Sequence, residues 1–518
     1  MRRTAGLDSP ISIPMLVVLL LTLVATAQAE LTLPQLFGDN MVLQREAPIP
    51  VWGWASPGQE VEVTLGDNSA AAVAGADGRW RVELPPMEAG GPHQVTITAG
   101  EQSRALENVL IGEVWLCAGQ SNMQWSILVV RDAEQEIQAA NYPRLRLFNV
   151  PVRSSGVPAD DVAATWRVCS PATIAQDGGF PAVPYFFGRK LHQDLDVPVA
   201  VIAAAWGGTR IEGWIPPEGY ASNPALADYL LQIEQAGPKF RDDLSTAVPQ
   251  YESWLPEARR ALDAGERVPD PPLWPRHPLD SAERPTGIYN GMIHPLVPFA
   301  LRGAIWYQGE SNAGDGMMYF EKMKALIAGW RQLWGRPELP FYYVQIAPCD
   351  LDPLYAGDAL PELWEAQTAV MRAVPHTGMA VISDVGDLHD IHPRNKQEVG
   401  RRLALWALAE TYGRDDIVPT GPIYRSLAVE ANRLRIEFDY VGQGLSTRDG
   451  KDPDLFEVAG ADGQFVPARA DIVGDAVVVW SDDITTPTAV RFAWSRTAVP
   501  NLMNQNGLPA SPFRARVE

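Results

Sequence analysis

Residues 114–125 read Val-Trp-Leu-Cys-Ala-Gly-Gln-Ser-Asn-Met-Gln-Trp, an apolar run that passes into a turn of small and polar residues. Similar apolar runs follow at 199–205, 303–307, 341–346 and 379–383, with helical stretches between them that include 319–334 and 396–412. Continuous apolar strands that alternate with helices are typical of a parallel sheet covered on both faces. The sequence from 109 to 414 therefore predicts an α/β domain with three layers.

The flanking zones have a different pattern. Residues 30–108 and 415–518 alternate apolar and polar residues between Gly, Asp and Pro turns, which predicts an N-terminal β-sandwich module and a C-terminal β-module. Residues 216–284, inside the central domain, are rich in Pro, Trp and charge. This segment is interpreted as an irregular insertion with one helical stretch near 251–264.

Composition excludes several classes of protein. The 518 residues include 63 acidic and 42 basic side chains, a net charge of -21, and 46% of them are hydrophobic. The length predicts several folded domains rather than a disordered chain. The acidity argues against a nucleic-acid partner, because such proteins need clustered Lys and Arg.

The first 29 residues have the pattern of a secretory signal peptide. Arg2 and Arg3 precede an apolar run at 15–24, and Ala27-Gln-Ala29 supplies a cleavage site. The run is short for a membrane anchor. We therefore expect a periplasmic or secreted protein with no membrane association after cleavage.

The cysteines do not form a pattern that indicates a structural site. The chain has three, and none belongs to a C-x-x-C pair, so neither a disulfide framework nor a structural zinc site is predicted. One disulfide, between Cys117 and either Cys169 or Cys349, remains open.

The first strand end carries a candidate nucleophile. Ligands bind outside the carboxyl ends of parallel strands, and Ser121 lies on the turn that follows the first apolar run. A serine between strand and helix exposes its Oγ and can direct its own N–H at an oxyanion. The stretch is not G-x-S-x-G, because Met123 occupies the last position, and a serine that only caps a helix is the alternative.

Two other strand ends offer oxyanion donors. Gly207 and Gly208 follow the second run, and paired glycines let backbone N–H groups approach an anion closely. Asn312 follows the third run, and its amide is a candidate donor. Ser311 beside it repeats the first motif and is a rival nucleophile.

The last strand end holds two of the seven histidines. His389 and His392 lie in the loop 384–396 with three aspartates, directly before a predicted helix. A serine hydrolase needs a histidine base oriented by a carboxylate or a carbonyl, and this loop can supply both. A metal site and a solvated acidic loop are the alternatives.

Five ordered motifs resemble those of the SGNH hydrolases and, more closely, the sialate O-acetylesterase family. They are Gly112-Glu-Val-Trp-Leu-Cys-Ala-Gly-Gln-Ser-Asn-Met-Gln-Trp, Trp206-Gly-Gly-Thr-Arg-Ile-Glu-Gly-Trp, Tyr289-Asn-Gly-Met-Ile-His-Pro-Leu, Trp306-Tyr-Gln-Gly-Glu-Ser-Asn-Ala and Asp390-Ile-His-Pro-Arg-Asn-Lys. The resemblance spans roughly residues 31–518. It implies a three-layer hydrolase core flanked by β-modules, and an esterase that removes O-acetyl groups from sugars without a metal or other cofactor.

The resemblance also implies roles for individual residues. Ser121 would be the nucleophile and His392 the base, whose protonation should lower activity below about pH 6. Asp390 is preferred over Asp387 as the orienting acid, although a backbone carbonyl is a further option. Ser121, Gly208 and Asn312 would form the oxyanion hole. Ser311 and His389 would then be neighbours, with His294 lining or supporting the site. Residues expected at the substrate are Gln120, Gly207, Arg210, Trp214, Tyr289, Asn290, Gln308 and Glu310.

The identity of the sugar is left open by the sequence. Arg210 can pair with the carboxylate of a sialic acid or close an internal ion pair. Acetylated xylan or xyloglucan is the other substrate class. A general carboxylesterase or lipase of the same fold, and a non-catalytic carbohydrate-binding protein, are the alternative functions. The sequence does not predict the oligomeric state.

Overall fold

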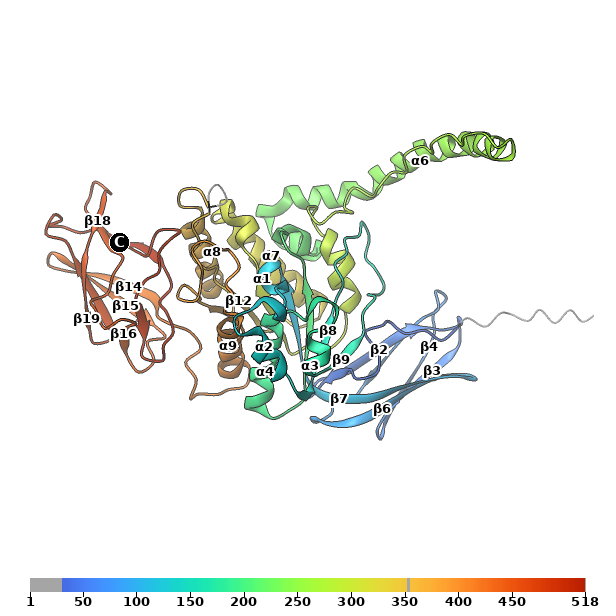
Figure 1. Cartoon of the computed structure of the whole chain (residues 1–518), viewed down its shortest axis with the longest axis horizontal. Helices are drawn as coiled ribbons and strands as arrows, with labels where there is room; N and C mark the ends of the chain where they lie inside the picture. The colour runs from blue at the N-terminus through green and yellow to red at the C-terminus, as the bar shows by residue number, and fades with distance from the viewer. Residues whose placement is uncertain (1–29, 352–354, 518) are drawn as a thin grey trace, which may run out of the picture.

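The computed structural model describes residues 30–351 and 355–517. The predicted signal peptide, residues 1–29, lies outside this range. Figure 1 shows an N-terminal β region, a central α/β region and a C-terminal β region along the longest axis, with one long helix projecting from the centre. No helix in the described part of the chain is both long and apolar enough to cross a membrane.

Seven strands of the described residues form the central sheet, in the order β13-β12-β11-β7-β10-β8-β9. Neighbours are parallel except β9, which pairs antiparallel with β8 at the edge. The bounds are β7 (Gln102–Gly119), β8 (Tyr142–Asn149), β9 (Trp166–Cys169), β10 (Val199–Ala205), β11 (Gly303–Tyr307), β12 (Phe341–Val344) and β13 (Thr377–Ala380). The parallel sheet predicted from the apolar runs is confirmed, although β12 and β13 end earlier than the runs do.

Helices cover both faces of this sheet. Adjacent residues of β12 point to opposite faces: Tyr342 stacks on Trp406 of α9, and Tyr343 donates to the Gln367 carbonyl of α8. α4 packs on α9, and α7 packs on α8. The bounds are α1 (Ser121–Gln124), α2 (Ala133–Gln138), α3 (Pro171–Ile174), α4 (Ala182–Leu195), α5 (Pro217–Ala221), α6 (Ala227–Asp263), α7 (Met318–Leu333), α8 (Ala359–Ala373) and α9 (Lys396–Trp406).

Short 3-10 and π turns connect these elements. They are η1 (Ile127–Val129), η2 (Gln176–Gly178), η3 (Ile211–Trp214), η4 (Pro224–Leu226), η5 (Tyr289–Ile293), η6 (His294–Leu296), η7 (Glu310–Asp315) and η8 (Ala407–Thr411). The helix predicted over 396–412 is thus an α-helix that ends at Trp406 and continues as the π turn η8.

The N-terminal β region shares a strand with the central sheet. The first half of β7 pairs antiparallel with β6, and its second half lies between β10 and β11. The expected change of domain at residue 108 therefore falls inside one continuous strand. The other strands are β1 (Val42–Gln44), β2 (Ile49–Trp54), β3 (Glu60–Leu65), β4 (Asn68–Val73), β5 (Arg79–Leu84) and β6 (Gly90–Ala99). One hydrophobic core is continuous through both regions.

A buried carboxylate joins the two regions. Glu113, in the middle of β7, accepts hydrogen bonds from Arg45 at 2.5 Å and from Arg302 at 2.7 Å. Burial by itself would raise the pKa of Glu113, but the two arginines outweigh it and hold the pKa below its usual value. The N-terminal region is therefore fixed to the central sheet by charge as well as by apolar packing.

The C-terminal β region has a hydrophobic core of its own. One sheet contains β14 (Ile423–Glu430), β15 (Arg433–Asp439), β20 (Ala476–Trp480) and β19 (Arg469–Val473). A second contains β18 (Phe465–Pro467), β17 (Phe456–Ala459), β21 (Ala489–Phe492) and β23 (Phe513–Arg516), and β16 (Leu445–Thr447) pairs with β22 (Leu502–Asn504). Arg514 forms an ion pair with Glu365 of α8 at 2.7 Å, and this region lies beside α8 (Figure 1).

The insertion differs from its prediction. The structure contains a 37-residue helix, α6, where the sequence predicted helix only near 251–264. Pro238, Pro249 and Pro256 lie inside it, and because proline destabilises the interior of a helix, the sequence argued against a continuous helix. A packed segment on one side of the helix supplies the stabilisation that local propensity lacks, because Tyr251 donates to the Pro272 carbonyl at 2.5 Å and Trp254 to the Pro269 carbonyl at 2.9 Å.

All three cysteines are buried and free, so the disulfide left open by the sequence is not formed.

Replacing Glu113 with Gln should destabilise the protein. Neutralising one partner of a buried ion pair leaves the others without compensation, and we expect the free energy of unfolding to fall by about 3 kcal/mol. Thermal unfolding measures the change, and the exposed Glu83→Gln variant is the matched control. The difference in free energy of unfolding between wild type and Glu113→Gln should narrow below about pH 4.5, because Glu113 is protonated there in the unfolded chain. Equal midpoints for the two variants at pH 7 would contradict this account.

Candidate active site

The turn that carries Ser121, the candidate nucleophile, depends on a glycine at the end of β7. Gly119 has a φ of 147°, and a Cβ there would lie 2.2 Å from the Tyr307 carbonyl oxygen of β11. The chain then turns through Gln120, and Ser121 becomes the first residue of α1. Met123 is fully buried beneath the turn. The close passage of β11 therefore presents Ser121 at the carboxyl edge of the sheet.

Ser121 and His392 form a hydrogen-bonded pair. Ser121 Oγ lies 2.9 Å from His392 Nε2, although 271 positions separate the two residues in sequence. On the other side of the ring, His392 Nδ1 lies 3.3 Å from Asp390 Oδ1, which also accepts the His392 backbone N–H at 2.9 Å. Asp387 instead accepts the backbone N–H of His389. Of the two candidate acids, Asp390 is thus the one that contacts the imidazole.

Trp125 fixes the plane of the imidazole. Its ring stacks on that of His392 with centroids 4.2 Å apart and an angle of 14° between the planes. Trp125 is the last residue of the first sequence motif, and nothing in the sequence indicated its contact with His392. The stacking gives it a positioning role, because the ring holds Nε2 toward Ser121.

The second strand end presents a backbone donor beside the nucleophile. The Gly207 N–H is donated to Gln124 Oε1 at 2.8 Å, and a Cβ on Gly207 would lie 3.3 Å from Ser121 Cβ. Gly208 follows with a φ of 76° and an exposed backbone. Within the described residues, the N–H groups of Ser121 and Gly208 have no acceptor. They are the free donors that an oxyanion requires.

The structure does not place Asn312 as an oxyanion donor. Its side chain is fully buried, and both amide hydrogens are donated to carboxylates, to Glu212 at 3.0 Å and Asp315 at 2.7 Å. Its carbonyl accepts from the Ile211 N–H and from Gln308, which fixes the orientation of the amide. No hydrogen remains for an oxyanion, so the prediction from the G-x-x-N motif does not fit this geometry.

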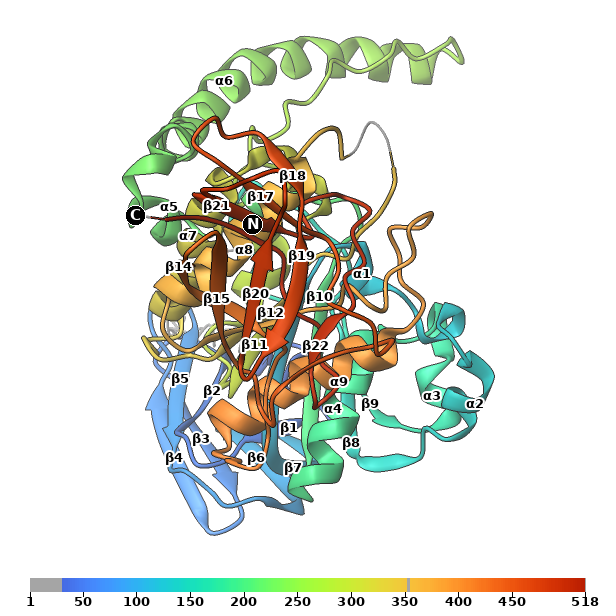
Figure 2. The same cartoon turned by 90° about the vertical axis from the view of Figure 1, so that its left-hand side faces the viewer.

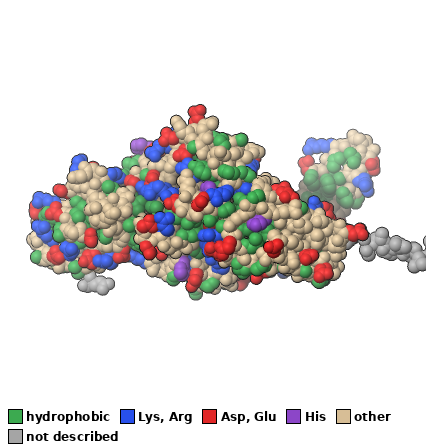
Figure 3. All heavy atoms as spheres, turned by 90° about the horizontal axis from the view of Figure 1, so that it is seen from below, with side chains coloured by type: hydrophobic (Ala, Val, Ile, Leu, Met, Phe, Trp, Pro, Cys, Tyr) green, Lys and Arg blue, Asp and Glu red, His purple; other side chains and the backbone are tan. Residues whose placement is uncertain are grey.

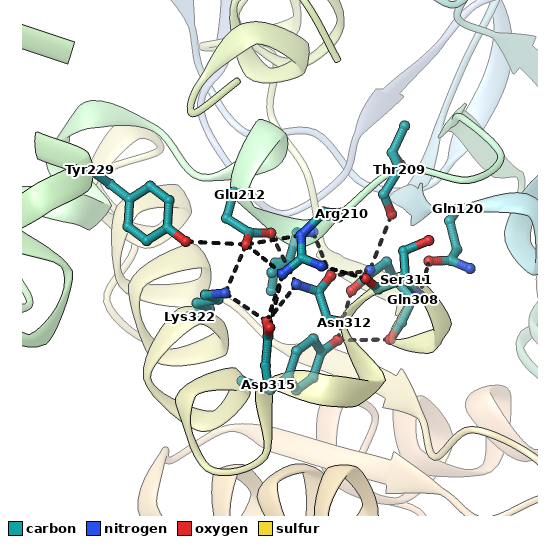
Figure 4. Close-up of polar contacts among 12 residues, drawn as sticks. Gln120, Thr209, Arg210, Glu212, Tyr229, Gln308, Ser311, Asn312, Asp315 and Lys322 are labelled. Carbon is teal, nitrogen blue, oxygen red and sulfur yellow. Dashed lines mark hydrogen bonds and ion pairs between the residues drawn. The ribbon is translucent and has the colours of Figure 1, made fainter. Parts of the chain in front are cut away.

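Arg210 belongs to the same polar cluster (Figure 4). Its guanidinium donates to Glu212 at 3.0 Å, to Asp315 at 2.9 Å and to the Ser311 carbonyl at 2.8 Å. Lys322 binds the same two carboxylates at 2.7 and 2.6 Å. Burial would raise the pKa of Glu212, but Lys322 and Arg210 outweigh it and lower the pKa to about 2. Of the two options for Arg210, the structure shows the internal ion pair.

Most of the other residues expected at the substrate are buried. The group comprises Gln120, Trp214, Tyr289, Asn290, Gln308 and Glu310. Two of them bind the protein itself: Trp214 donates to Thr209 at 3.1 Å and Asn290 to the Ser155 carbonyl at 3.0 Å. Glu310 differs, because its Oε2 is buried without a hydrogen-bond partner among the described residues. Gly207 and Arg210 remain at the surface, and His294 is held by the Ala159 carbonyl at 2.9 Å.

The structure also bears on the acidic loop and on Ser311, the rival nucleophile. Asp384 forms a two-pronged ion pair with Arg402 of α9 at 2.6 and 2.8 Å, so it is a fixed part of the fold. Across residues 30–351 and 355–517, no three His, Cys, Asp or Glu side chains converge as metal ligands. The backbone N–H of Ser311 lies 3.5 Å from Gln120 Oε1, and its carbonyl is bound by Arg210, which makes it a neighbour of the site.

A buried hydrogen-bond network next to Ser121, here called the relay, was not predicted from the sequence. Asn122 donates to Glu310 and, at 2.7 Å, to the Ile391 carbonyl, and it accepts a hydrogen bond from Lys396 at the start of α9. The relay joins the loops that carry the nucleophile and the base. Asn122 is adjacent to Ser121 in sequence and Lys396 follows the histidine loop, but nothing in the sequence indicated that they meet.

Burial also shifts the pKa values of the ionisable groups in this relay. It lowers the pKa of Lys396 to about 7 and raises that of Glu310, although each partly stabilises the charge of the other. Burial likewise lowers the pKa of His392 below its usual value. Asp390 opposes this shift and Lys396 adds to it. The shift favours the neutral imidazole, the form that can accept a proton from Ser121.

Comparison with known proteins identifies the family of the chain. A family model described as "Carbohydrate esterase, sialic acid-specific acetylesterase" matches residues 280–408. A sialate O-acetylesterase of Rattus norvegicus is 32% identical over 92% of this chain and 93% of its own length. The chain belongs to the sialate O-acetylesterase family. The Homo sapiens sialate O-acetylesterase is 30% identical, over 92% of this chain and 91% of its own.

A solved structure extends the comparison to the whole fold. A carbohydrate acetylesterase from Xanthomonas citri superposes with a TM-score of 0.79 at 35% identity, covering 94% of this chain and 100% of that one. The α/β core with β-rich regions on both sides is therefore an arrangement that this member of the sialate O-acetylesterase family shares with a known esterase.

Asp390→Asn should lower activity and shift its pH dependence. Removal of the carboxylate that orients the imidazole should reduce kcat/KM roughly 10²- to 10⁴-fold. Because Asp390 raises the pKa of His392, the acid limb of the pH–kcat/KM profile should also shift to lower pH. Asp387→Asn, the matched control, should leave both unchanged. A larger loss in Asp387→Asn would reassign the orienting acid.

Removing the buried charges should shift the profile in the opposite direction. In Lys396→Met/Glu310→Gln the ammonium that lowers the pKa of His392 is absent, so the acid limb should shift to higher pH. The single Lys396→Met variant leaves a buried carboxylate unpaired and should unfold at a lower temperature than the double variant. An acid limb that stays in place or shifts down in the double variant would show that Lys396 does not act on His392.

Proposed function

We propose that this member of the sialate O-acetylesterase family is a serine esterase that removes O-acetyl groups from carbohydrates. The observation that carries the proposal is the 2.9 Å contact between Ser121 Oγ and His392 Nε2, beside the free N–H groups of Ser121 and Gly208. A serine–imidazole pair next to two unpartnered amides is suited to acyl transfer. The relatives named as sialate and carbohydrate acetylesterases support an acetylated sugar as the substrate.

The chemistry follows from the positions of these groups. His392 Nε2 accepts the Ser121 proton while Oγ attacks the acetyl carbonyl, and Asp390 with Trp125 holds the ring in place. The N–H groups of Ser121 and Gly208 bind the oxyanion. Each such donor typically contributes about 10²–10³ in rate. The imidazolium then protonates the departing sugar oxygen as its bond to the acyl carbon breaks, which releases the sugar hydroxyl. His392 next takes a proton from water, which attacks the acetyl-enzyme and frees acetate and Ser121.

For the sugar, we propose a neutral acetylated hemicellulose such as xylan or xyloglucan. Arg210, the cation placed to bind a sialic acid carboxylate, already binds Glu212 and Asp315. A substrate carboxylate would have to displace one of them. The net charge of -21 disfavours an anionic substrate further. We also propose that the chain is exported by its N-terminal 29 residues, which would bring it to such polymers.

Ser121→Ala should abolish acetate release. Loss of the nucleophile typically costs at least about 10⁴-fold in kcat, and Ser311→Ala serves as the matched control that should keep its activity. Acetate release from acetylated xylan, measured with purified wild type and both variants, gives the comparison. Activity retained in Ser121→Ala, or lost in Ser311→Ala alone, would overturn the nucleophile assignment.

The same assay separates the substrate classes. We expect kcat/KM for acetylated xylan or xyloglucan to exceed that for O-acetylated sialic acid at least tenfold. The reverse order would overturn the neutral-sugar proposal and leave the esterase proposal intact. Rates that rise with acyl-chain length on p-nitrophenyl esters would favour a lipase, and no acetate release from any glycan would favour a binding protein.

A further inference from the structure

A projecting arm is the part of the molecule that the esterase chemistry does not use. The arm consists of α6 (Ala227–Asp263) and the returning segment 264–284. Figures 1 and 2 show it extending away from the body, with the end distant from the three regions. A helix of 37 residues is about 55 Å long. An isolated helix of this length buries little apolar surface and therefore gains little stability from packing, so its stability depends on what covers it.

One face of α6 is already covered within the chain. Phe240 packs on His277 and Tyr251 on Trp274, with ring centroids 5.0 and 5.2 Å apart. Trp254 donates to the Pro269 carbonyl of the same returning segment. This face therefore needs no partner.

A second apolar row lies beside the covered face and is exposed. Val248, Leu255 and Leu262 are 42%, 62% and 68% exposed, and they recur every seven residues. Seven residues make almost two turns of an α-helix, so the three side chains form one row along the arm. Figure 3 shows green hydrophobic side chains gathered on the projecting arm, with red and blue charged groups around them.

The arm is poorly stabilised as a single unit. The buried residues of α6 within the described chain are four alanines, at 236, 247, 258 and 261. Three prolines inside the helix each remove a backbone hydrogen bond. A long helix with few buried side chains gains little from packing. A second layer on the exposed row would add the missing burial.

The exposed row is complementary to a copy of itself. Val248 and Leu262 are equally distant from Leu255 in sequence, so two antiparallel helices would pair Leu255 with Leu255 and Val248 with Leu262. In this register Glu252 of each helix lies near Arg259 of the other, so the dimer contains two equivalent pairs of opposite charge. Neither side chain has an ion-pair partner among the described residues. A two-fold interface requires a surface that complements itself in this way.

We propose that the arm is the interface of a homodimer, in which two copies of α6 pair antiparallel with Leu255 on the two-fold axis. The contact is small, because it involves one face of one helix from each copy. Small interfaces support weak association, and we expect a dissociation constant on the order of 10 µM. Ser121 and His392 belong to the central region, so each copy keeps its complete site.

Cross-linking through one position tests the axis directly. The three natural cysteines are buried, so Leu255→Cys introduces the accessible thiol. Because residue 255 meets its own copy in the proposed dimer, mild oxidation should convert most of this variant to a disulfide-linked dimer. Leu231→Cys, equally on α6 and 50% exposed but outside the row, is the matched control and should remain monomeric. Equal cross-linking of both variants would overturn the register.

Sedimentation measures the association itself. The mature chain should pass from monomer to dimer between about 1 and 200 µM. Leu255→Asp should abolish this change, whereas Leu231→Asp should not. Glu252→Arg should weaken association roughly tenfold by placing like charges together, and Glu252→Arg/Arg259→Glu should restore it.

Other occupants of the row would give different results. A wild type that stays monomeric to 200 µM overturns the proposal. If Leu255→Asp then reduces binding to insoluble acetylated xylan, the row contacts the polysaccharide instead. Failure of the charge swap to restore association, with both variants folded, also overturns the antiparallel register. Acetate release from a soluble substrate should be the same in all arm variants.

Discussion

The close passage of β11 past the end of β7 is the constraint on which the site depends. At Gly119 the carbonyl of Tyr307 occupies the position of a side chain, so the strand ends in a turn that only glycine can form here. The same contact places the turns after β7, β10 and β11 side by side. Gly207 then approaches Ser121 so closely that it too has no room for a side chain without displacing its neighbours.

Buried polar groups hold these turns, and hydrogen bonds between them offset most of the cost of burial, although Glu310 Oε2 has no partner among the described residues. Asn122 forms hydrogen bonds with Glu310, Lys396 and the Ile391 carbonyl, so it ties the loop of Ser121 to the loop of His392. A few residues away, Arg210 and Lys322 neutralise Glu212 and Asp315 around the Asn312 amide. Charge that would be expensive alone is tolerated because each group has an opposite partner. The backbone N–H groups of Ser121 and Gly208, which have no acceptor among the described residues, lie on the turns that these contacts hold.

The regions outside the catalytic layer are attached in different ways. The N-terminal β region continues through β7 into the central sheet and shares its core, with Glu113 joining the two by charge. The C-terminal region keeps a separate core and meets α8 through polar contacts such as the pair of Arg514 and Glu365. In the described part of the molecule, the arm shares no strand with the body and meets the central core only at its base, through residues that include Tyr229, Leu230 and Ile233. This difference is the physical basis for assigning it to contacts between molecules.

The sequence by itself determined the fold class, because uninterrupted apolar runs are compatible with a sheet buried on both faces. It also determined which residue types follow each strand, so Ser121 and His392 could be named as partners before their contact was known. The length of α6 could not be predicted, because packing of the returning segment overrides three prolines. Asn312, Trp214 and Glu310 carried the expected chemistry, yet tertiary packing turned their side chains into the protein. Only the tertiary structure decided this, since a sequence gives the type of a group and its place on a strand, while the direction in which it points depends on neighbours far along the chain.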